Sequence, residues 1–431
     1  MKEDFLHYIW KFQKFETQKL RSVCGQSISI VEVGQHNFDS GPDFFNAKLI
    51  IDGQLWAGNI EIHVEASQWY SHNHDIDVAY DTVILHLVWE HDTDVFRSDS
   101  SKIPVLALKE RVATHTLRSY RNLFESTKDW INCEGSFDKV PSFVVENWLE
   151  RLYLERLEQK MNEILQALTA SKNHWEALMF RLLCKNFGLK VNGAQFYGMA
   201  QWLPFSIVQK CRNNVLDLEA LLFGVSGLLS KPQEDAYFKE LLKRYRYLCT
   251  KFNLRPPLIL PPKFFRLRPA NFPTIRLSQL AVLYSSKQHI FATSNAMKSI
   301  DAYYDFFTVA ASTYWDTHYN FGTTSKQRKK RVTKKFIDLL LINTLLPIRF
   351  CYAKQRNTDV SEEIVALATT IAAEHNTIVK KFNALQPVAE NALQSQGLIQ
   401  LKNEYCNQLR CLHCAIGNSV LQSADHDIRF R

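Results

Sequence analysis

The spacing of the apolar residues changes once along the chain, and this change limits the possible folds more than any other feature. After one opening helical stretch, apolar and polar residues mostly alternate up to about residue 107, which is typical of strands with one buried face. From about residue 140, beginning with "SFVVENWLERLYLERLEQKMNEILQALTAS", apolar residues recur at helical spacing. We therefore predict an α+β protein.

The predicted division follows from that change. A small α/β domain with an opening helix and a mixed sheet should occupy residues 1–135. A mostly α-helical region should occupy residues 136–431, with a subdivision near the proline-rich residues 254–277.

The first part has a clear order of elements. "FLHYIWKF" predicts the opening helix and "SISIVEV" a strand. "AKLIIDGQLWAGNIEIHV" predicts two strands joined at Asp52-Gly53, a residue pair that favours tight hairpin turns. "TVILHLVWE" predicts a buried strand that follows a polar crossover.

Three residues of this part, Asp43, Glu61 and His63, indicate a chemical site. Glu61 and His63 should share one face of their strand, because strand side chains alternate. Asp43 follows Pro42 where the preceding strand begins, and the hairpin folds that strand back beside the next. We expect the two carboxyl groups to converge near the imidazole. Such a set suits a divalent metal that positions water against a phosphodiester.

This pattern resembles the core of the PD-(D/E)XK nuclease superfamily. The resemblance implies that Asp43 and Glu61 hold Mg²⁺ or Mn²⁺ and that Glu3, in the opening helix, is an auxiliary acid. His63 stands where the superfamily has a lysine that orients or deprotonates the attacking water. Imidazole can act as a base near neutral pH or bind metal. Either the site works with histidine, or the nuclease core has lost its activity.

Two other interpretations of the same region stay open. Asp39 and Asp43 can cap turns while Glu61 and His63 face solvent. The segment "SHNHDID" has a spacing that suits zinc, and it is similar in part to the histidine box of metallo-β-lactamase-like hydrolases. In the nuclease-like interpretation, which we follow, three histidines line the cleft as auxiliary residues: His72, His74 and His86.

The segment "EYCNQLRCLHCAIGN" brings Cys406, Cys411 and Cys414 close together in sequence. Three thiols at this spacing favour zinc or an iron–sulfur cluster, because soft sulfur ligands suit both. The arrangement is similar in outline to nucleases of the superfamily that carry such a cluster. The alternative is that these cysteines are buried packing residues. Candidates for a fourth ligand are Cys24, His413 and Cys133, of which we include Cys133 in the set.

Two basic stretches are candidates for contact with a nucleic-acid backbone, and the formal net charge of +8 permits a polyanionic partner. A solvated helix face, or packing between proline and aromatic residues, explains them equally simply. The predicted nucleic-acid-binding residues are Lys326, Arg328, Lys329, Lys330, Arg331, Arg266, Arg268 and Arg276.

Several stretches together resemble an uncharacterised bacterial family, domain-of-unknown-function family 2851. They include "GPDFFNAKLIIDG", "GNIEIHV", "WYSHNHDIDVAYDTVILHLV", "RPANFPTIRLSQLA" and "RCLHCAIGN". The resemblance covers nearly the whole chain, but it implies no particular activity.

The chain contains no uninterrupted run of about 18 apolar residues and no signal-peptide pattern, so we expect a cytoplasmic protein without a membrane span. The predicted function is a metal-dependent phosphodiesterase or nuclease that acts on DNA or RNA. The alternative is a non-catalytic protein that binds nucleic acid or protein and keeps a degenerate nuclease-like scaffold.

Overall fold

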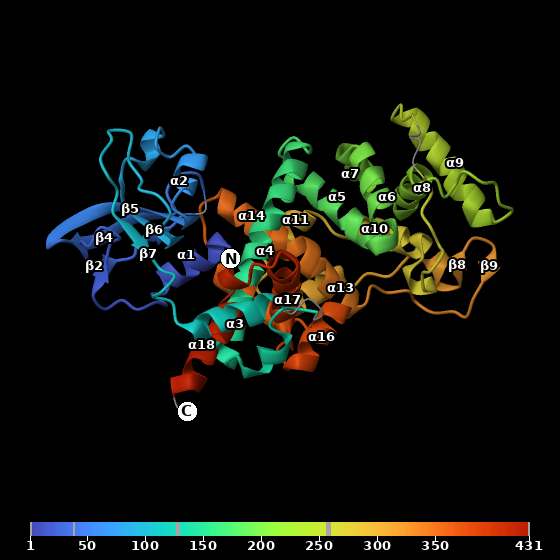
Figure 1. Cartoon of the computed structure of the whole chain (residues 1–431). Helices are drawn as coiled ribbons and strands as arrows, with labels where there is room; N and C mark the ends of the chain where they lie inside the picture. The colour runs from blue at the N-terminus through green and yellow to red at the C-terminus, as the bar shows by residue number, and fades with distance from the viewer. Residues whose placement is uncertain (1, 38, 126–129, 256–259, 430–431) are drawn as a thin grey trace. The chain divides into compact units, whose positions relative to one another are not determined.

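The computed structural model describes residues 2–37, 39–125, 130–255 and 260–429 (Figure 1). The chain divides into two compact units. Unit 1 contains Met1–Trp148, Ala384–Gln386 and Leu401–Arg431, and unit 2 contains Leu149–Asn383 and Pro387–Gln400.

Unit 1 differs from the predicted N-terminal domain because the end of the chain returns to it. Cys411, Leu412 and Leu421 pack in the same core as the opening helix and the sheet. Helical periodicity shows that a segment has an apolar face but not which neighbour covers that face. The predicted subdivision near 254–277 falls partly on residues 256–259, which lie outside the described residues, and the described residues on both sides of it belong to unit 2.

A mixed sheet forms the centre of unit 1, with strand order β1-β2-β4-β5-β6-β7 and β3 paired to β4. The pairs β2/β4 and β4/β5 are antiparallel, and β5/β6 and β6/β7 are parallel. The elements of unit 1 are α1 (Glu3–Lys11), β1 (Leu20–Arg21), β2 (Ser27–Glu32), β3 (Gln35–His36), β4 (Phe44–Ile51), β5 (Gln54–Glu65), α2 (Gln68–Ser71), η1 (Val78–Tyr80), β6 (Val83–Glu90), β7 (Val105–Ala107), α3 (Thr114–Glu125), η2 (Glu134–Lys139), η6 (Leu401–Cys406), η7 (Cys411–His413) and α18 (Ala415–Arg429).

The β4–β5 hairpin sets the register on which the site depends. Asp52 and Gly53 both have positive φ angles, 48° and 82°, as the tight turn between paired Ile51 and Gln54 requires. Further along, Phe44 pairs with Ile60 after a register shift. The start of β4 is therefore held beside the second half of β5.

Among the described residues of unit 1, two apolar cores hold the sheet. The larger core includes Phe5, Leu6, Ile9 and Trp10 of α1, each fully buried, together with Ile60 and other residues of the strands. This pattern confirms the predicted apolar face of the opening helix. The smaller core lies under the α2–η1 crossover and consists of Ala66, Trp69, Tyr80, Val83, Val88, Val95, Ile103 and Val105.

Unit 2 is mostly helical and has one large apolar core. Its elements are α4 (Ser142–Thr169, which begins in unit 1), α5 (Trp175–Phe187), α6 (Leu189–Trp202), α7 (Phe205–Cys211), α8 (Val215–Val225), α9 (Ala236–Lys251), η3 (Pro269–Asn271), α10 (Pro273–Ser286), α11 (Ile290–Asn295), α12 (Ile300–Phe307), η4 (Thr313–Asp316), β8 (His318–Asn320), β9 (Thr323–Thr324), α13 (Lys334–Leu340), η5 (Leu341–Leu345), α14 (Leu346–Gln355), α15 (Ser361–Thr370), α16 (Thr377–Leu385, whose end counts with unit 1) and α17 (Ala392–Gln400). The predicted α+β class, with an N-terminal mixed sheet and a mostly helical remainder, is confirmed.

One helical stretch of unit 2, Lys334–Gln355, is long and apolar enough to cross a membrane by length and composition. Most of its apolar window is buried inside the protein. Leu340, Leu341 and Leu346 have no exposed surface. Its composition is therefore that of a central core helix.

Candidate site of carboxylates and histidines

Asp43 and Glu61 lie together at the place where β4 begins beside β5. The backbone N–H of Asp43 donates a hydrogen bond to Glu61 Oε2 at 3.2 Å. In return, Asp43 Oδ2 accepts a hydrogen bond of 2.9 Å from the backbone N–H of Ile62. The antiparallel pairing thus brings together two carboxyl groups that are 18 residues apart in the chain.

His63 lies on the same face of β5 as Glu61, two positions further along the strand, and its side chain is 1% exposed. Its Nε2 lies 3.7 Å from Glu61 Oε1. Its Nδ1 is 2.8 Å from His86 Nε2, and its Nε2 is 3.1 Å from His72 Nδ1. Both nitrogens of this imidazole therefore face other histidines.

His72 and His74 enter the same space from the crossover between β5 and β6. Each of His63, His72 and His74 offers one ligand atom, and these three atoms lie within 4.8 Å of one another. His74 Nε2 is also 3.3 Å from Glu61 Oε1. The crossover therefore completes a cluster that the strands begin.

Aromatic packing fixes the position of His74. Tyr80 stacks on the His74 ring with 3.7 Å between ring centroids, and Trp69 contacts that ring by its edge. The backbone N–H of His74 donates to the carbonyl of Trp69 at 3.0 Å. Asp77 caps η1 by accepting a hydrogen bond from the backbone N–H of Ala79, so the crossover has a defined path.

Helix α1 adds His7, which is not among the predicted site residues. His7 Nε2 lies 3.3 Å from Asp43 Oδ2. Glu3, which we predicted as an auxiliary acid, also acts on Asp43 and His7 through its charge. The sequence did contain a signal for His7: Glu3 and His7 are four residues apart, and residues at this spacing lie on the same face of a helix.

Burial governs the ionisation of the two predicted groups on β5. Burial and the charge of Asp43 raise the pKa of Glu61 well above its ordinary range. Burial and neighbouring histidines, His86 first among them, lower the pKa of His63 to about 2. At neutral pH this part of the site therefore holds a protonated carboxyl group and a neutral imidazole.

The other histidines of the site are affected in different directions. Burial is the main reason that the pKa of His86 falls to about 3 and that the pKa of His74 is lowered. Burial also lowers the pKa of His7, but a hydrogen bond with Asp43 and the charges of Asp43 and Glu3 outweigh that effect and raise it. Of these residues and His63, His7 is therefore the histidine that holds a proton most readily.

The position of His63 differs from the one expected for a group that activates water. A general base works best when its pKa lies near the operating pH and when it reaches the water. His63 is buried, has a strongly lowered pKa and has both nitrogens against other histidines. A buried neutral imidazole is better suited to bind metal.

The distances around Glu61 are close to those between ligands of a common cation. Ligand atoms about 2.1 Å from one ion lie about 3 to 3.5 Å apart. Glu61 Oε1 is 3.3 Å from His74 Nε2, within this range, and 3.7 Å from His63 Nε2, slightly outside it. In addition, the buried Nδ1 atom of His74 has no hydrogen-bond partner among the described residues. The cluster is therefore not fully satisfied by its own hydrogen bonds.

The predicted nucleic-acid-binding residues fall into two groups, all within unit 2. Arg276 is buried, lies over the ring of Phe336, and donates hydrogen bonds to Asn271 and Gln279. Lys330 is buried and donates to the carbonyls of Trp315 and Asp316. These two side chains therefore cannot reach a nucleic-acid backbone. The remaining predicted residues are exposed: Lys326, Arg328, Lys329, Arg331, Arg266 and Arg268.

The predicted sulfur ligands Cys133, Cys406, Cys411 and Cys414 all belong to unit 1. Of the other candidates for a fourth ligand, Cys24 is exposed, whereas His413 stacks on His36 with 6.1 Å between ring centroids.

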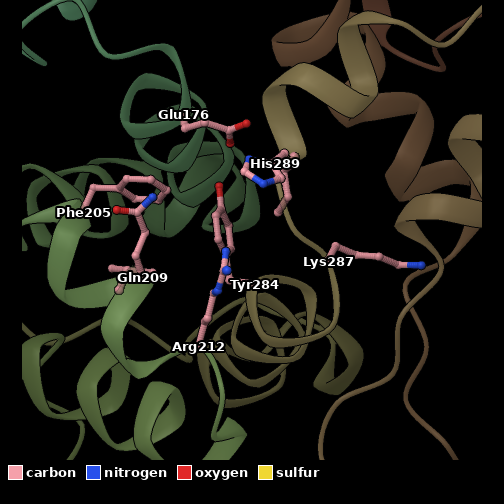
Figure 2. Close-up of a pocket in the computed structure, with 9 residues that line it drawn as sticks. Glu176, Phe205, Gln209, Arg212, Tyr284, Lys287 and His289 are labelled. Atoms are coloured by element: carbon pink, nitrogen blue, oxygen red, sulfur yellow. The ribbon is translucent and has the colours of Figure 1, made fainter.

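Two pockets lie away from the carboxylate and histidine cluster, and neither has a comparable cluster of ligand groups. A groove of about 620 Å³ in unit 1 is lined by residues 12–16 and 110–113 together with His115 and Thr116. Figure 2 shows a cavity in unit 2, where Glu176, Tyr284 and His289 surround a space of about 30 Å³ and Lys287 is directed away from it. That volume matches one water molecule, so this cavity is too small for a substrate.

The fold and the site define a class of protein: an α+β chain with a buried cluster of carboxylates and histidines on a mixed sheet. Within that class, the chain belongs to the family described as protein of unknown function (DUF2851), whose profile matches residues 3–377. The match ends before the three C-terminal cysteines. Neither a curated protein nor a solved structure matches the chain significantly.

Proposed function

We propose that unit 1 is a metal-dependent hydrolase that cleaves phosphodiester bonds in DNA or RNA. The observation that supports it most is the convergence of Asp43, Glu61 and the trio His63, His72 and His74. Carboxylates and neutral imidazoles in one space are the usual protein ligands of a divalent first-row metal.

The mixture of ligands decides which metal we expect. Mg²⁺ prefers oxygen ligands in octahedral geometry, whereas imidazole binds first-row transition metals such as Zn²⁺ more readily than Mg²⁺. The two carboxylates by themselves predict Mg²⁺ or Mn²⁺. With His63 and His74 both within 4 Å of Glu61 Oε1, we now favour Mn²⁺ over Mg²⁺.

The residues then have separate roles. Asp43 and Glu61 supply the anionic ligands, and His63 and His74 supply neutral ones. His86 orients His63 through the 2.8 Å contact between Nε2 and Nδ1. His7, with its raised pKa, holds a proton beside Asp43 and so balances part of the negative charge of that carboxylate.

The reaction that we propose is a simple hydrolysis. A water oxygen forms a bond to phosphorus, the bond between phosphorus and the leaving oxygen breaks, and that oxygen takes up a proton. A bound cation would stabilise the charge on the phosphate and lower the pKa of water. The part of the site open to solvent includes exposed His72 and the partly exposed Asp43. Ile76 and Val78 of the same crossover are 73% and 75% exposed, so they are free to make apolar contacts with a bound substrate.

The test is cleavage of linear and circular DNA and of RNA, each with Mn²⁺, Mg²⁺ or Zn²⁺. Asp43→Asn and Glu61→Gln should reduce the rate by about two orders of magnitude or more, because several kcal/mol of charge stabilisation depends on the cation. Glu65→Gln is the matched control, since Glu65 lies on the same strand but is exposed. Cleavage by both site variants at the wild-type rate would exclude this site.

A second candidate function is nucleic-acid binding without cleavage. The exposed cations Lys326, Arg328, Lys329 and Arg331 favour it, because each contact with phosphate adds affinity that falls as salt increases. Tight, salt-dependent binding by a wild-type protein that cleaves nothing with any of the three metals would support this second function instead.

A further inference from the structure

Acidic residues are absent from two long stretches of the sequence of unit 2. Residues 241–300 contain eleven lysines and arginines but no aspartate or glutamate, and residues 317–337 contain seven and again no acid. Because the whole chain has a formal net charge of +8, the residues outside these two stretches carry a net charge of −10. Such a separation of charge is typical of a protein that meets a polyanion.

Several of these cations are exposed and have no acidic partner. Among the described residues, no carboxylate forms an ion pair with any of seven exposed cations, which we call the cationic surface of unit 2: Lys263, Arg266, Arg268, Lys326, Arg328, Lys329 and Arg331. By contrast, Arg244 of α9 pairs with Asp217 and Glu240. The charge of the cationic surface is therefore left for a ligand.

The loop before η3 presents an aromatic ring beside part of this surface. The side-chain amide of buried Asn192 donates to the carbonyl of Lys263 at 2.8 Å, and its oxygen accepts from the backbone N–H of Lys263 at 2.7 Å. In the loop that these bonds hold, Phe265 is 75% exposed, and the guanidinium of Arg266 lies 5.2 Å from its ring centroid. An exposed ring with a cation beside it is the combination on which unpaired bases stack.

Hydrogen bonds also hold the backbone of residues 326–331. The backbone N–H of Arg328 donates to the carbonyl of Asp316 at 2.8 Å. Lys330 turns inward, and its side chain donates to the carbonyls of Trp315 and Asp316. The exposed cations on both sides of Lys330 therefore extend from a backbone that is already ordered, which lowers the entropy lost when they bind phosphate.

Buried side chains connect the loop to this basic segment. Arg276 donates to Asn271 Oδ1 at 2.6 Å and to Gln279 Oε1 at 2.9 Å. Gln279 Nε2 in turn donates to the carbonyl of Lys330 at 2.8 Å. At the other end, the backbone N–H of Asn271 donates to the carbonyl of Arg268 at 2.8 Å. The two parts of the cationic surface are therefore neighbours, and a ligand several nucleotides long can contact both.

We propose that unit 2 binds single-stranded nucleic acid through its cationic surface, with one base stacked on Phe265. This inference rests on the second candidate function given above and narrows it to a strand whose bases are unpaired. In a duplex the bases stack on one another, whereas a single strand can offer the face of a base to an aromatic ring. A lipid surface would instead favour an amphipathic helix, and these cations lie in a loop and in an extended segment.

The experiment is fluorescence anisotropy with the full chain in EDTA, using labelled DNA and RNA strands of about 20 nucleotides and the matching duplexes. We expect the single strands to bind more tightly. Phe265→Ala should weaken single-strand binding by about fivefold to 150-fold, the range that one stacked base contributes, and should leave duplex binding unchanged. Tyr247→Ala is the matched control, because Tyr247 is also an exposed aromatic residue with a cation near its ring.

Two further variants test the stacking and the phosphate contacts separately. Phe265→Trp keeps an aromatic ring, so it should bind as the wild type does, and single strands should quench the tryptophan emission that it adds. This signal reports stacking even if Phe265→Ala does not fold. Arg328→Gln should lower the slope of log affinity against log salt by about 0.7, the value of one single-strand phosphate contact. Lys380→Gln, at an exposed position of unit 2 outside the two acid-free stretches, should not change the slope.

The possible outcomes distinguish this inference from the functions proposed above. Equal binding of duplex and single strand, with no loss in Phe265→Ala, would overturn the single-strand assignment and leave nucleic-acid binding in place. Failure to bind any of the strands or duplexes would overturn both, and binding to phosphatidylserine vesicles instead would identify a lipid surface as the partner. Because EDTA removes divalent metals, none of these results depends on cleavage by unit 1.

Discussion

Glu61 should release its proton when the carboxylate site binds a cation, and Glu61→Gln should abolish that release. Burial and the charge of Asp43 raise the pKa of Glu61, so the carboxyl group is protonated in the metal-free protein at neutral pH. A carboxyl group must lose its proton to bind metal as an anion. Binding of Mn²⁺ should therefore release about one proton from Glu61.

The magnitude follows from that linkage. Below the folded-state pKa of Glu61, each unit of pH should raise the affinity for the cation about tenfold, which corresponds to about 1.36 kcal/mol. His63 and His74 have lowered pKa values, so they are already neutral and contribute no proton. His7 has a raised pKa, so it can also release a proton when the cation binds, and this release should remain in Glu61→Gln. The difference between the two proteins isolates Glu61.

The variant should leave the metal-free fold intact. Glutamine has nearly the shape of a protonated glutamate, and its carbonyl oxygen can still accept the hydrogen bond from the backbone N–H of Asp43. At pH 7 the unfolded wild-type chain ionises Glu61 while the folded chain keeps it protonated. The metal-free variant should thus be as stable as the wild type or more stable.

Isothermal titration calorimetry with Mn²⁺, in buffers of different ionisation enthalpy, measures the protons released. Thermal unfolding with and without Mn²⁺ measures the stabilisation, which should reach about 2.7 kcal/mol at a hundredfold excess over Kd in the wild type and be much smaller in Glu61→Gln. Equal affinity of both proteins, or wild-type affinity that does not change between pH 6 and pH 8, would refute the reasoning.

Two further predictions concern stability. Burial raises the folded-state pKa of Glu219, so the wild type should lose stability as pH rises above about 4.5, where the carboxyl group of the unfolded chain ionises. In urea unfolding, the free energy of unfolding of Glu219→Gln should equal that of the wild type near pH 4 and exceed it near pH 8. Gly53→Ala should lower the free energy of unfolding by about 1 kcal/mol, because Gly53 has a φ of 82°. Gly198→Ala in helix α6 should raise it by about 0.5–1 kcal/mol, since the added Cβ would meet no atom within 4 Å. Higher stability of both glycine variants would contradict the first of these reasons for the glycine positions. Stability that changes with pH in the same way in the wild type and in Glu219→Gln would contradict the prediction for Glu219.

Local sequence signals predicted the elements that carry the site. Alternation predicted β5 and placed Glu61 and His63 on one face, and Asp52-Gly53 predicted the hairpin. Those two signals together predicted that Asp43 and Glu61 would meet, because a tight turn folds the two strands back on each other. The register shift between Ala47 and Phe44, which sets the final pairing at the site, was not predicted.

Other features depended on contacts that a linear pattern does not encode. Lys330 stands in a run of exposed cations, yet it turns inward to two backbone carbonyls. In the sequence, His7 is one polar residue of an amphipathic helix. Its contact with Asp43 depends on the start of β4 lying beside α1. The burial that lowers the pKa of His63 comes from the crossover and from β6, which follow it in the chain.

The sequence by itself determined the classes of element, the position of the hairpin turn and the ligand types, because propensity and alternation act over a few residues. Only the tertiary structure decided which groups are buried against one another: His7 beside Asp43, and His63 with its two ring nitrogens against His72 and His86. The physical reason is that burial, and with it the ionisation of each group, depends on neighbours contributed by the whole fold.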